Sequence, residues 1–378
     1  MQPRSAPRVL VADDQADVLI ALRLLLKEEQ VDADTAGSVQ EIRTKLDALP
    51  YDLLLMDLNY ARDTTSGREG LDLLAQVHER DPLLPVVVMT GWGSIETAVE
   101  AMRRGARTFV LKPWENVDLT NTLRREIEHG RAARRTERSA SRAREEAQAI
   151  QRALLPACST TLPGCEIAAR WSPASAFAGD FYDAVRLDEG RVAVSVGDVC
   201  GKGLPAALLM ANVQASVRAF AAADPSPRRV AARVNRELTA NAGLGRFVTF
   251  FYAVYDAGTR RLAFTNAGHN PPVLVRPDGS IARLTGGDMV LGAFQTATYD
   301  EHAIALGPGD RLVLFTDGVT DAADAGDREF GDDRLVDAIV RRRAASASQI
   351  ANGLFDEVVR FSEGRLDDDA TVVVVAVC

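Results

Sequence analysis

The stretch Val192–Met210 reads VAVSVGDVCGKGLPAALLM: an apolar run ends in an aspartate and leads through a glycine-containing turn into another apolar segment. A β-rich run that ends in this way holds a carboxylate at a sheet edge, where it can meet solvent and ligand. Four further runs carry aspartates at one end: RVLVADD (Arg8–Asp14), YDLLLMD (Tyr51–Asp57), RLVLFTD (Arg311–Asp317) and DDDATVVVV (Asp367–Val375). Together they predict metal-dependent phosphoryl chemistry in two regions of the chain.

Length and composition narrow the class of protein. With 378 residues, the chain is too long for one typical core and suits two domains with a connector. Its net charge of −9 argues against nucleic acid as the main partner. The cysteines form no CxxC pair and are expected to be reduced. Neither a signal peptide nor an apolar run of roughly 20 residues is evident, so we expect no membrane partner and a cytoplasmic location.

Residues 1–122 alternate between strand-like and helix-like segments. RVLVA precedes an amphipathic stretch over Asp17–Glu29. The runs DLLLM, PVVVMT and TFVLK are each followed by a helix-like segment: Gly70–Glu79, Ser94–Arg104 and a helix from about Asn116. This alternation predicts a parallel α/β sheet with helices on both faces and ligands at the carboxyl ends of its strands.

Five functional side chains fall at those strand ends. Carboxylates that share one site repel each other unless a cation neutralises them, and all-oxygen ligands suit Mg²⁺. A carboxylate beside Mg²⁺ can accept a phosphoryl group, and a nearby ammonium and hydroxyl would stabilise its charge. Any one of them alone would be read as a strand-end cap or a surface ion pair. The five are Asp13, Asp14, Asp57, Thr90 and Lys112.

This first region resembles the receiver domain of bacterial response regulators, a doubly wound, flavodoxin-like α/β fold. The resemblance rests on the pair Asp13-Asp14, MDL around Asp57, MTGWGS with Thr90 and FVLKPW with Lys112-Pro113. It implies that Asp57 is the phosphoacceptor, and that Asp13 and Asp14 bind Mg²⁺ together with the backbone carbonyl of Asn59.

The same resemblance assigns roles around the phosphoryl group. Lys112 would contact that group, Thr90 would respond to it, and Phe109 would move between states. The Lys112–Pro113 bond is a candidate cis peptide, because only X–Pro bonds tolerate that form cheaply. The loop after Asp57, NYARDTTSGREG, is longer than the usual short turn and is expected to be mobile.

Residues 123–155 are expected to form a helical linker. From Val117 to Leu155 there is no proline, Gly130 is the only glycine, and helix-forming residues dominate. We predict a parallel coiled coil that makes a homodimer, with Gly130 as a hinge. A single solvated helix is the alternative, because the Arg-rich middle has few large apolar residues. The apolar positions are Leu119, Leu123 and Ile127, then Ala140, Ala143, Ala147, Ile150 and Leu154.

Residues 156–378 follow another pattern, with strand-like runs next to one another and two helix-like stretches, Leu204–Ala222 and Pro227–Asn241. This predicts an α+β sandwich whose sheets are covered by helices. Aspartates from distant positions share one signature, an Asp beside Gly or at a strand end. Converging carboxylates without a His cluster suit hard cations, and two such ions can hold a hydroxide in line with phosphorus.

The second region resembles the protein phosphatase 2C superfamily, in its bacterial branch of sporulation and stress-response phosphatases. The matching segments are LLP (154–156), AGDFYD (178–183), GDVCGKGLPAALLM (197–210), NAGHNPP (266–272), GDRLVLFTDGVTDA (309–322) and DDDATVVVV (367–375). The resemblance implies a phosphatase that uses two Mn²⁺ or Mg²⁺ ions. The implied ligands are Asp180, Asp198, Asp317, Asp368 and the Val199 carbonyl, with Asp321 and Asp369 as outer or third-metal ligands.

The chain departs from the eukaryotic branch at two positions. An arginine before the first metal-binding aspartate and a histidine after the second are replaced by Ser175 and Cys200. Lys202 is a candidate phosphate contact, although GKG is no Walker loop. His269 is either a proton donor or, as we favour, a turn-stabilising residue.

The segment after Asp198 is expected to act as the switch. A helix that opens at Leu204-Pro205 would present an apolar face formed by Leu208, Leu209, Val213 and Val217. Its movement would change the geometry at Asp198, at a coupling free energy of roughly 1–3 kcal/mol.

The sequence thus predicts a response regulator whose Asp57 is phosphorylated by a histidine kinase. Its phosphatase domain would act on phosphoserine or phosphothreonine of a partner protein, by resemblance an anti-sigma-factor antagonist. One alternative is an adaptor that binds partners without turnover. A DNA-binding regulator would need a helix-turn-helix and a basic face, which the C-terminal half does not supply.

Overall fold

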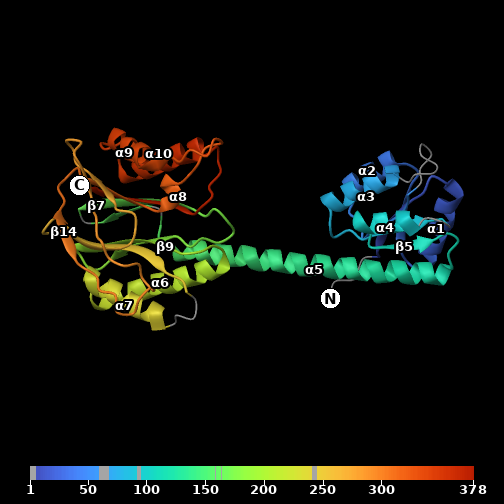
Figure 1. Cartoon of the computed structure of the whole chain (residues 1–378), viewed down its shortest axis with the longest axis horizontal. Helices are drawn as coiled ribbons and strands as arrows, with labels where there is room; N and C mark the ends of the chain where they lie inside the picture. The colour runs from blue at the N-terminus through green and yellow to red at the C-terminus, as the bar shows by residue number, and fades with distance from the viewer. Residues whose placement is uncertain (1–5, 59–67, 92–94, 158, 163, 241–244) are drawn as a thin grey trace. The chain divides into compact units, whose positions relative to one another are not determined.

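A computed structural model describes residues 6–378 of the chain except 59–67, 92–94, 158, 163 and 241–244. The chain divides into two compact units, Met1–Ala143 and Arg144–Cys378 (Figure 1). Each unit has its own sheets and its own hydrophobic cores, and each is described by itself below.

The first unit is built on a five-stranded, all-parallel sheet with strand order β2-β1-β3-β4-β5. This order confirms the doubly wound, flavodoxin-like fold expected from the alternating pattern. Its elements are β1 (Arg8–Ala12), α1 (Ala16–Glu28), β2 (Asp32–Ala36), α2 (Val39–Ala48), β3 (Leu53–Asp57), α3 (Arg68–Arg80), β4 (Val86–Thr90), α4 (Ile95–Arg103), β5 (Thr108–Leu111) and α5 (Asn116–Leu154).

The central strands are buried on both faces, which explains their continuous apolar runs. On β3, Leu54 and Met56 pack in the core under α2 and α3, whereas Leu53 and Leu55 face the core under α1 and α5. The strand therefore ends with its last residue, Asp57, at the carboxyl edge of the sheet.

The pair β2–α2 was not expected from the sequence. Strand β2 reads DADTA, pairs only with β1, and is largely half-exposed, so it lacks the apolar run that marks the inner strands. Helix α2 begins after Ser38, whose side chain accepts a hydrogen bond from the Glu41 backbone N–H. As the edge strand, β2 does not need an apolar run, so its hydrophobic pattern does not reveal it.

Helix α5 is continuous from Asn116 to Leu154, and it passes through Gly130 without a break. Its first apolar positions, Leu119, Leu123 and Ile127, belong to the core of the first unit. A β-carbon on Gly130 would lie 2.5 Å from Cγ of Pro85. Close packing therefore gives a reason for the glycine other than the hinge expected from the sequence.

The second unit contains two antiparallel sheets. One has the order β14-β11-β10-β9-β8, and the other has the order β13-β12-β15-β16-β7-β6. The elements are β6 (Ser159–Leu162), β7 (Cys165–Ser172), β8 (Phe181–Arg186), β9 (Arg191–Val199), α6 (Leu204–Ala223), α7 (Pro227–Ala240), β10 (Val248–Asp256), β11 (Arg261–Ala267), β12 (Val273–Val275), β13 (Ile281–Arg283), β14 (His302–Ala305), β15 (Arg311–Phe315), α8 (Asp317–Thr320), α9 (Gly331–Arg341), α10 (Ala347–Phe361) and β16 (Ala370–Val377).

These elements form four layers, with α6 and α7 on the outer face of one sheet and α9 and α10 on that of the other (Figure 1). Three cores fill the gaps between the layers. The result confirms the expected sandwich with helices over both sheets. The helices α9 and α10, and the short edge strands β6 and β14, were not anticipated from the sequence.

The alternation along β9 positions its acidic end. Val194 and Val196 face the core between the two sheets, whereas Ala193 and Val199 face α6 and α7. Asp198 continues the first series, so its carboxylate lies on the inter-sheet face at the end of the strand.

The prediction for the apolar face of α6 is partly wrong. Val213 and Val217 are buried, but Leu208 is 65% exposed, and the buried face continues through Ala206 and Met210 instead. In the described ranges, α6 is the one helix long and apolar enough to cross a membrane by length and composition. It packs on β8, β9 and α7, as core helices of globular domains do.

The packing of Gly130 predicts the sign of a substitution. Gly130→Ala should destabilise the first unit by about 1 kcal/mol, because overpacking against the Pro85 ring costs about 1–3 kcal/mol and outweighs a helix-propensity gain of about 1 kcal/mol. In a Pro85→Ala background the same change should be neutral or stabilising. Scanning calorimetry of the four proteins measures both effects. A Gly130→Ala protein more stable than the wild type would contradict the packing explanation.

Candidate functional site

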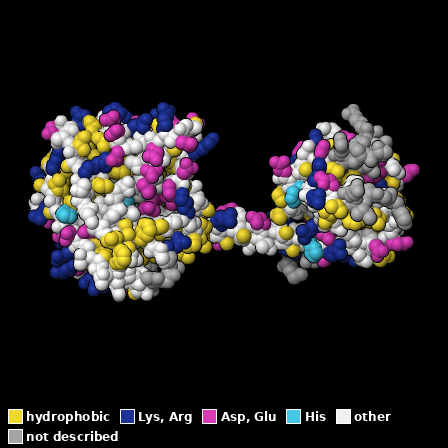
Figure 2. Space-filling view, in the orientation of Figure 1, with side chains coloured by type: hydrophobic (Ala, Val, Ile, Leu, Met, Phe, Trp, Pro, Cys, Tyr) yellow, Lys and Arg dark blue, Asp and Glu magenta, His cyan; other side chains and the backbone are white. Residues whose placement is uncertain are grey.

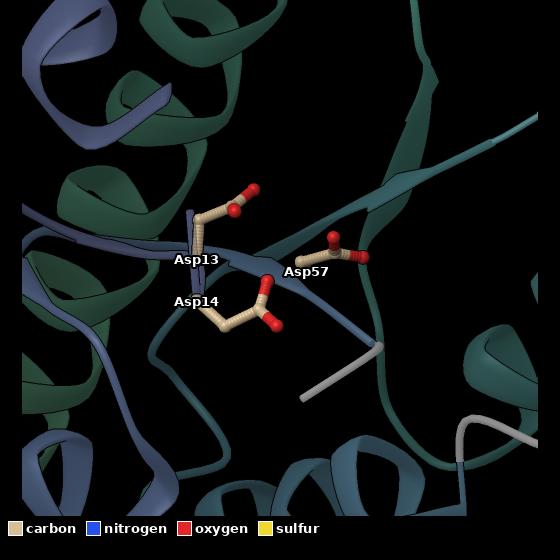
Figure 3. Close-up of side chains that lie close together, drawn as sticks. All are labelled: Asp13, Asp14 and Asp57. Carbon is tan, nitrogen blue, oxygen red and sulfur yellow. The ribbon is translucent and has the colours of Figure 1, made fainter. Parts of the chain in front are cut away.

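The first unit gathers three carboxylates at the carboxyl ends of β1 and β3 (Figure 3). Oxygen atoms of Asp13, Asp14 and Asp57 lie within 4.8 Å of one another. Asp13 and Asp57 are buried, whereas Asp14 is exposed. The strand-end pattern thus brings together the three side chains that the sequence analysis assigned to one Mg²⁺ site.

Lys112 supplies the positive charge beside these carboxylates. Its Nζ donates to Asp13 Oδ2 at 2.6 Å and to Asp57 Oδ2 at 2.7 Å. Burial lowers the pKa of Lys112, but the bonds to Asp13 and Asp57 outweigh burial and raise it overall. Lys112 is therefore held charged next to the expected phosphoacceptor. The Lys112–Pro113 peptide is cis, as expected.

The remaining receiver residues fall in different surroundings. Thr90 ends β4 and is buried, and its response to the phosphoryl group stays a prediction. Phe109 lies on β5 with 43% of its surface exposed. Asn59, the expected carbonyl ligand, and most of the long loop after Asp57 lie outside the described residues.

In the second unit, Asp180 is the most buried of the expected carboxylate ligands. Its Oδ2 accepts hydrogen bonds of 2.6 Å from the hydroxyls of Thr316 and Thr371. Burial, followed by the charge of Asp198, raises the pKa of Asp180 well above its usual range, although the two hydroxyls oppose the shift. Thr316 precedes Asp317 and Thr371 lies two residues after Asp369, but only the fold brings their hydroxyls onto Asp180.

Asp198 is half-buried amid other carboxylates. Burial raises its pKa to about 7, with further contributions from Asp317, Asp368 and Asp369, while Lys202 opposes the shift. Burial, Asp321 and Asp368 likewise raise the pKa of Asp317. The aspartates expected from distant parts of the sequence therefore share one electrostatic neighbourhood. Figure 2 shows acidic side chains gathered on one face of this unit.

The Asp369 carboxylate accepts hydrogen bonds from the backbone close to Asp180. Its two oxygens accept hydrogen bonds from the N–H groups of Ala174 at 2.8 Å and Gly179 at 2.7 Å. Burial raises its pKa, which these bonds oppose. Asp369 thus fixes the loop that carries Asp180, a role which the sequence analysis did not assign to it.

Two glycines beside the aspartates allow the backbone to approach closely. A β-carbon at Gly179 would lie 2.8 Å from the Val199 carbonyl oxygen, the expected backbone ligand. A β-carbon at Gly318 would lie 2.1 Å from the Asp369 carbonyl oxygen. The recurring Asp-Gly signature therefore has a packing cause, because the strand ends that carry the carboxylates almost touch here.

The oxygen donors of the second unit are not drawn into one tight cluster. In the described ranges, the receiver trio is the one group whose ligand atoms all lie within 4.8 Å. The donor set of the second unit consists of carboxylates and a carbonyl oxygen, which fits hard divalent cations. Burial first, and then repulsion between the like charges, raises the pKa values of Asp180, Asp198 and Asp317.

His269 lies behind this site in a neutral form. It is buried, its Nδ1 is 2.9 Å from Thr249 Oγ1, and Thr249 pairs opposite Asp198 in the sheet. Burial lowers the pKa of His269 to about 4. Its backbone exchanges hydrogen bonds with the Asn266 side chain at 2.7 and 3.0 Å. Of the two roles left open for His269, these contacts favour the structural one.

Comparison with known proteins identifies both units. Residues 188–377 match the family model of stage II sporulation protein E, and residues 9–124 match that of the response regulator receiver domain. The first match spans half of the chain, which therefore belongs to the stage II sporulation protein E family and carries a receiver domain ahead of the family region.

Individual relatives agree with this assignment. Protein IcfG of Synechocystis sp. is 28% identical over 61% of this chain and 41% of its own length. Phosphoserine phosphatase RsbU of Bacillus subtilis is 30% identical over 53% of this chain and 60% of its own length. The chain thus spans about half the length of these curated relatives.

A solved structure supports the fold of the second unit. The phosphatase 2C domain of SiaA from Pseudomonas aeruginosa superposes with a TM-score of 0.57 at 23% identity, over 64% of this chain and 99% of that one. This likeness concerns the fold alone, and it confirms the phosphatase 2C-like sandwich expected from the sequence.

The crowding around Asp198 predicts a gain in stability when its charge is removed. Because the folded state raises its pKa from 3.8 to about 7, stability of the metal-free protein falls as pH rises through that interval. Asp198→Asn should raise the midpoint of thermal unfolding in EDTA at pH 8 by roughly 2–8 °C, with a smaller change at pH 5. It should also weaken the stabilisation by Mn²⁺.

Thermal unfolding with EDTA or Mn²⁺ at the two pH values makes the test. Asp356→Asn, at an exposed position on α10, is the matched control and should change neither quantity. Full Mn²⁺ stabilisation in the Asp198→Asn protein, or a lower midpoint in EDTA at pH 8, would contradict the crowded-carboxylate site.

Proposed function

We propose that this protein is a cytoplasmic response regulator in which phosphorylation of Asp57 controls a metal-dependent protein phosphatase. The observation that carries the proposal is the pairing of two carboxylate sites in one chain, each in a unit that matches the corresponding family. A histidine kinase would supply the phosphoryl group to Asp57, since receiver domains take it from such donors.

The receiver half of the proposal rests on charge placement. Asp57 is buried between Asp13, Asp14 and the Lys112 ammonium. A carboxylate in this setting is poised to attack phosphorus, because a cation and an ammonium would neutralise the charge on the transferred group. Mg²⁺ would occupy the space beside Asp13 and Asp14, with the Asn59 carbonyl as a further ligand.

The hydrolytic half rests on the carboxylates of the second unit. Two Mn²⁺ or Mg²⁺ ions held by Asp180, Asp198, Asp317, Asp368 and the Val199 carbonyl would supply a hydroxide for attack on a phosphate monoester. The name of the RsbU relative supports phosphoserine as the substrate, with phosphothreonine the related possibility. By the resemblance to stress-response phosphatases, the substrate protein would be an anti-sigma-factor antagonist.

The C-terminal end of α5 provides the proposed connection to the catalytic site. Gln151 is buried, and its side chain bonds both backbone groups of Ala178: Nε2 donates to the carbonyl at 2.7 Å and Oε1 accepts from the N–H at 3.2 Å. Ala178 lies two residues before Asp180. A rotation of α5 would therefore move the backbone that carries a metal ligand.

Helix α6 holds the same end of α5. Gln214 Nε2 donates to the Leu154 carbonyl at 3.1 Å, and Arg218 reaches that carbonyl while it pairs with buried Asp183. The proposed switch helix and the linker are thus joined by hydrogen bonds. We infer that a change in α5 reaches Asp180 through Gln151 and the α6 side of the site through Leu154.

The proposed homodimer rests on the middle of α5. Ala140 and Ala143 are exposed and Ile150 is 64% exposed, whereas Ala147 and Leu154 are half-buried, so the three exposed positions of the stripe would carry the pairing with a second copy. Because parallel pairing would fix the rotation of each helix, the dimer offers a means of transmitting the state of Asp57.

The function is tested by hydrolysis of a phosphoserine protein with Mn²⁺, with and without beryllofluoride as a phosphoryl mimic on Asp57. We expect activity that rises with beryllofluoride in the wild type, does not respond in Asp57→Ala, and is lost in Asp198→Ala. Turnover indifferent to Asp57 would contradict receiver control. Equal results for the wild type and Asp198→Ala would favour the adaptor alternative.

The contact between Gln151 and Ala178 leads to a prediction about the coupling between the receiver and the phosphatase site. Gln151→Ala removes both bonds to Ala178, so the ratio of activities with and without beryllofluoride should fall toward one. Gln148→Ala, about one turn earlier on α5, is the matched control and should keep the wild-type ratio. A Gln151→Ala protein with the wild-type ratio would show that coupling does not use this contact.

A further inference from the structure

The catalytic face of the second unit carries a large excess of negative charge, and the proposed substrate is itself an anion. Burial and like charges already raise the pKa values of Asp180, Asp198 and Asp317. A phosphate monoester must approach these groups, so cationic side chains at the rim would lower the cost of binding. The position that holds a phosphate-binding arginine in the eukaryotic branch is Ser175 here.

Arg246 is placed to meet this need. Its Nη1 donates at 3.2 Å to the carbonyl of Cys200, which lies two residues after Asp198 and directly follows β9. Nη1 would lie 2.6 Å from a β-carbon at Gly201, where φ is +102°, so the glycine makes room for the guanidinium. Arg246 is half-buried, and in the described ranges it forms no ion pair with a carboxylate.

The sheet fixes the position of Arg246 relative to Asp198. Strands β9 and β10 pair with Thr249 opposite Asp198, and Cys200 N–H donates to the Phe247 carbonyl at 2.9 Å. The backbone next to Arg246 is therefore held by β10 and by the Phe247 carbonyl against β9, the strand that carries Asp198. Since a guanidinium has five N–H donors, one bond to Cys200 leaves the others for a ligand.

Lys202 provides a second cation on the same loop. Its Nζ lies 2.6 Å from the Asp367 carbonyl oxygen and 3.2 Å from Asp368 Oδ2, and its side chain is 57% exposed. Lys202 is thus partly neutralised by an expected metal ligand, whereas Arg246 is bound only to a backbone carbonyl among the described contacts. The two cations flank Gly201.

We propose that Arg246 binds the phosphate group of the substrate, with Lys202 as a supporting cation. The proposal rests on the proposed phosphatase function and names the residue that recognises its phosphomonoester dianion. The planar guanidinium offers parallel N–H donors to two phosphate oxygens, which an ammonium cannot do. Arg246 then occupies the role that Ser175 cannot fill.

The test compares Arg246→Ala, Arg246→Lys and the wild type. In Mn²⁺, Arg246→Ala should raise KM for a phosphoserine protein and for p-nitrophenyl phosphate by about ten- to hundredfold, because charge-assisted hydrogen bonds to the phosphate are lost. The inhibition constant of inorganic phosphate should rise by a similar factor, and Arg246→Lys should fall between. Mn²⁺ affinity, measured by calorimetry, should stay unchanged.

Arg365→Ala is the matched control, since it removes the same charge from an exposed side chain three residues before Asp368. We expect it to change KM and phosphate inhibition by less than about twofold, as surface charges act weakly. Equal effects in Arg365→Ala and Arg246→Ala would mean that the loss of positive charge acts at long range, and would overturn the proposal that Arg246 contacts the phosphate. Unchanged constants in Arg246→Ala would overturn the proposal as well.

Failure of the proposed function has a different signature. A wild type that hydrolyses neither substrate would contradict phosphatase activity. The role of Arg246 is then decided by calorimetric binding of inorganic phosphate to the Mn²⁺-loaded protein. Binding that weakens at least tenfold in Arg246→Ala but not in Arg365→Ala would support the assignment, and equal binding would overturn it.

Discussion

Repulsion among carboxylates at strand ends is the constraint on which both sites depend. In the first unit, Lys112 lies between Asp13 and Asp57 and offsets part of their charge. In the second unit, burial and the neighbouring carboxylates raise the pKa of Asp198 to about 7, although Lys202 opposes the shift. Bound cations would favour the ionised carboxylates and stabilise the folded protein, because opposite charge nearby lowers the pKa of a carboxyl group.

The two units bring carboxylates together by different means. A parallel sheet places Asp13 and Asp57 side by side because β1 and β3 are neighbours whose carboxyl ends share one edge. In the sandwich, Gly179 lets the segment before β8 approach Val199 at the end of β9, and Gly318 lets α8, which follows β15 of the other sheet, approach Asp369 before β16. Thr316 links these regions through its bond to Asp180.

Much of this arrangement could be predicted from the sequence, since a strand that ends in Asp is a local signal and the site consists of several such signals. The expected strands β1, β3, β9, β15 and β16 are all present. What escaped prediction depends on tertiary packing. The polar strand β2 is specified by its edge position, and the exposure of Leu208 by how α6 sits on its sheet. The contacts of Gln151 and Arg246 join residues 27 and 46 positions apart, which no local pattern reveals.

The central claim is that two separate carboxylate clusters each require divalent cations. Its most direct test is a count of bound Mn²⁺ by equilibrium titration with electron paramagnetic resonance, on the wild type, Asp13→Asn and Asp198→Asn. The account predicts one ion in the receiver unit and two in the phosphatase unit, with Asp13→Asn losing only the first and Asp198→Asn only the others. A wild type that binds no Mn²⁺ in the phosphatase unit, or variants that lose all ions together, would contradict it.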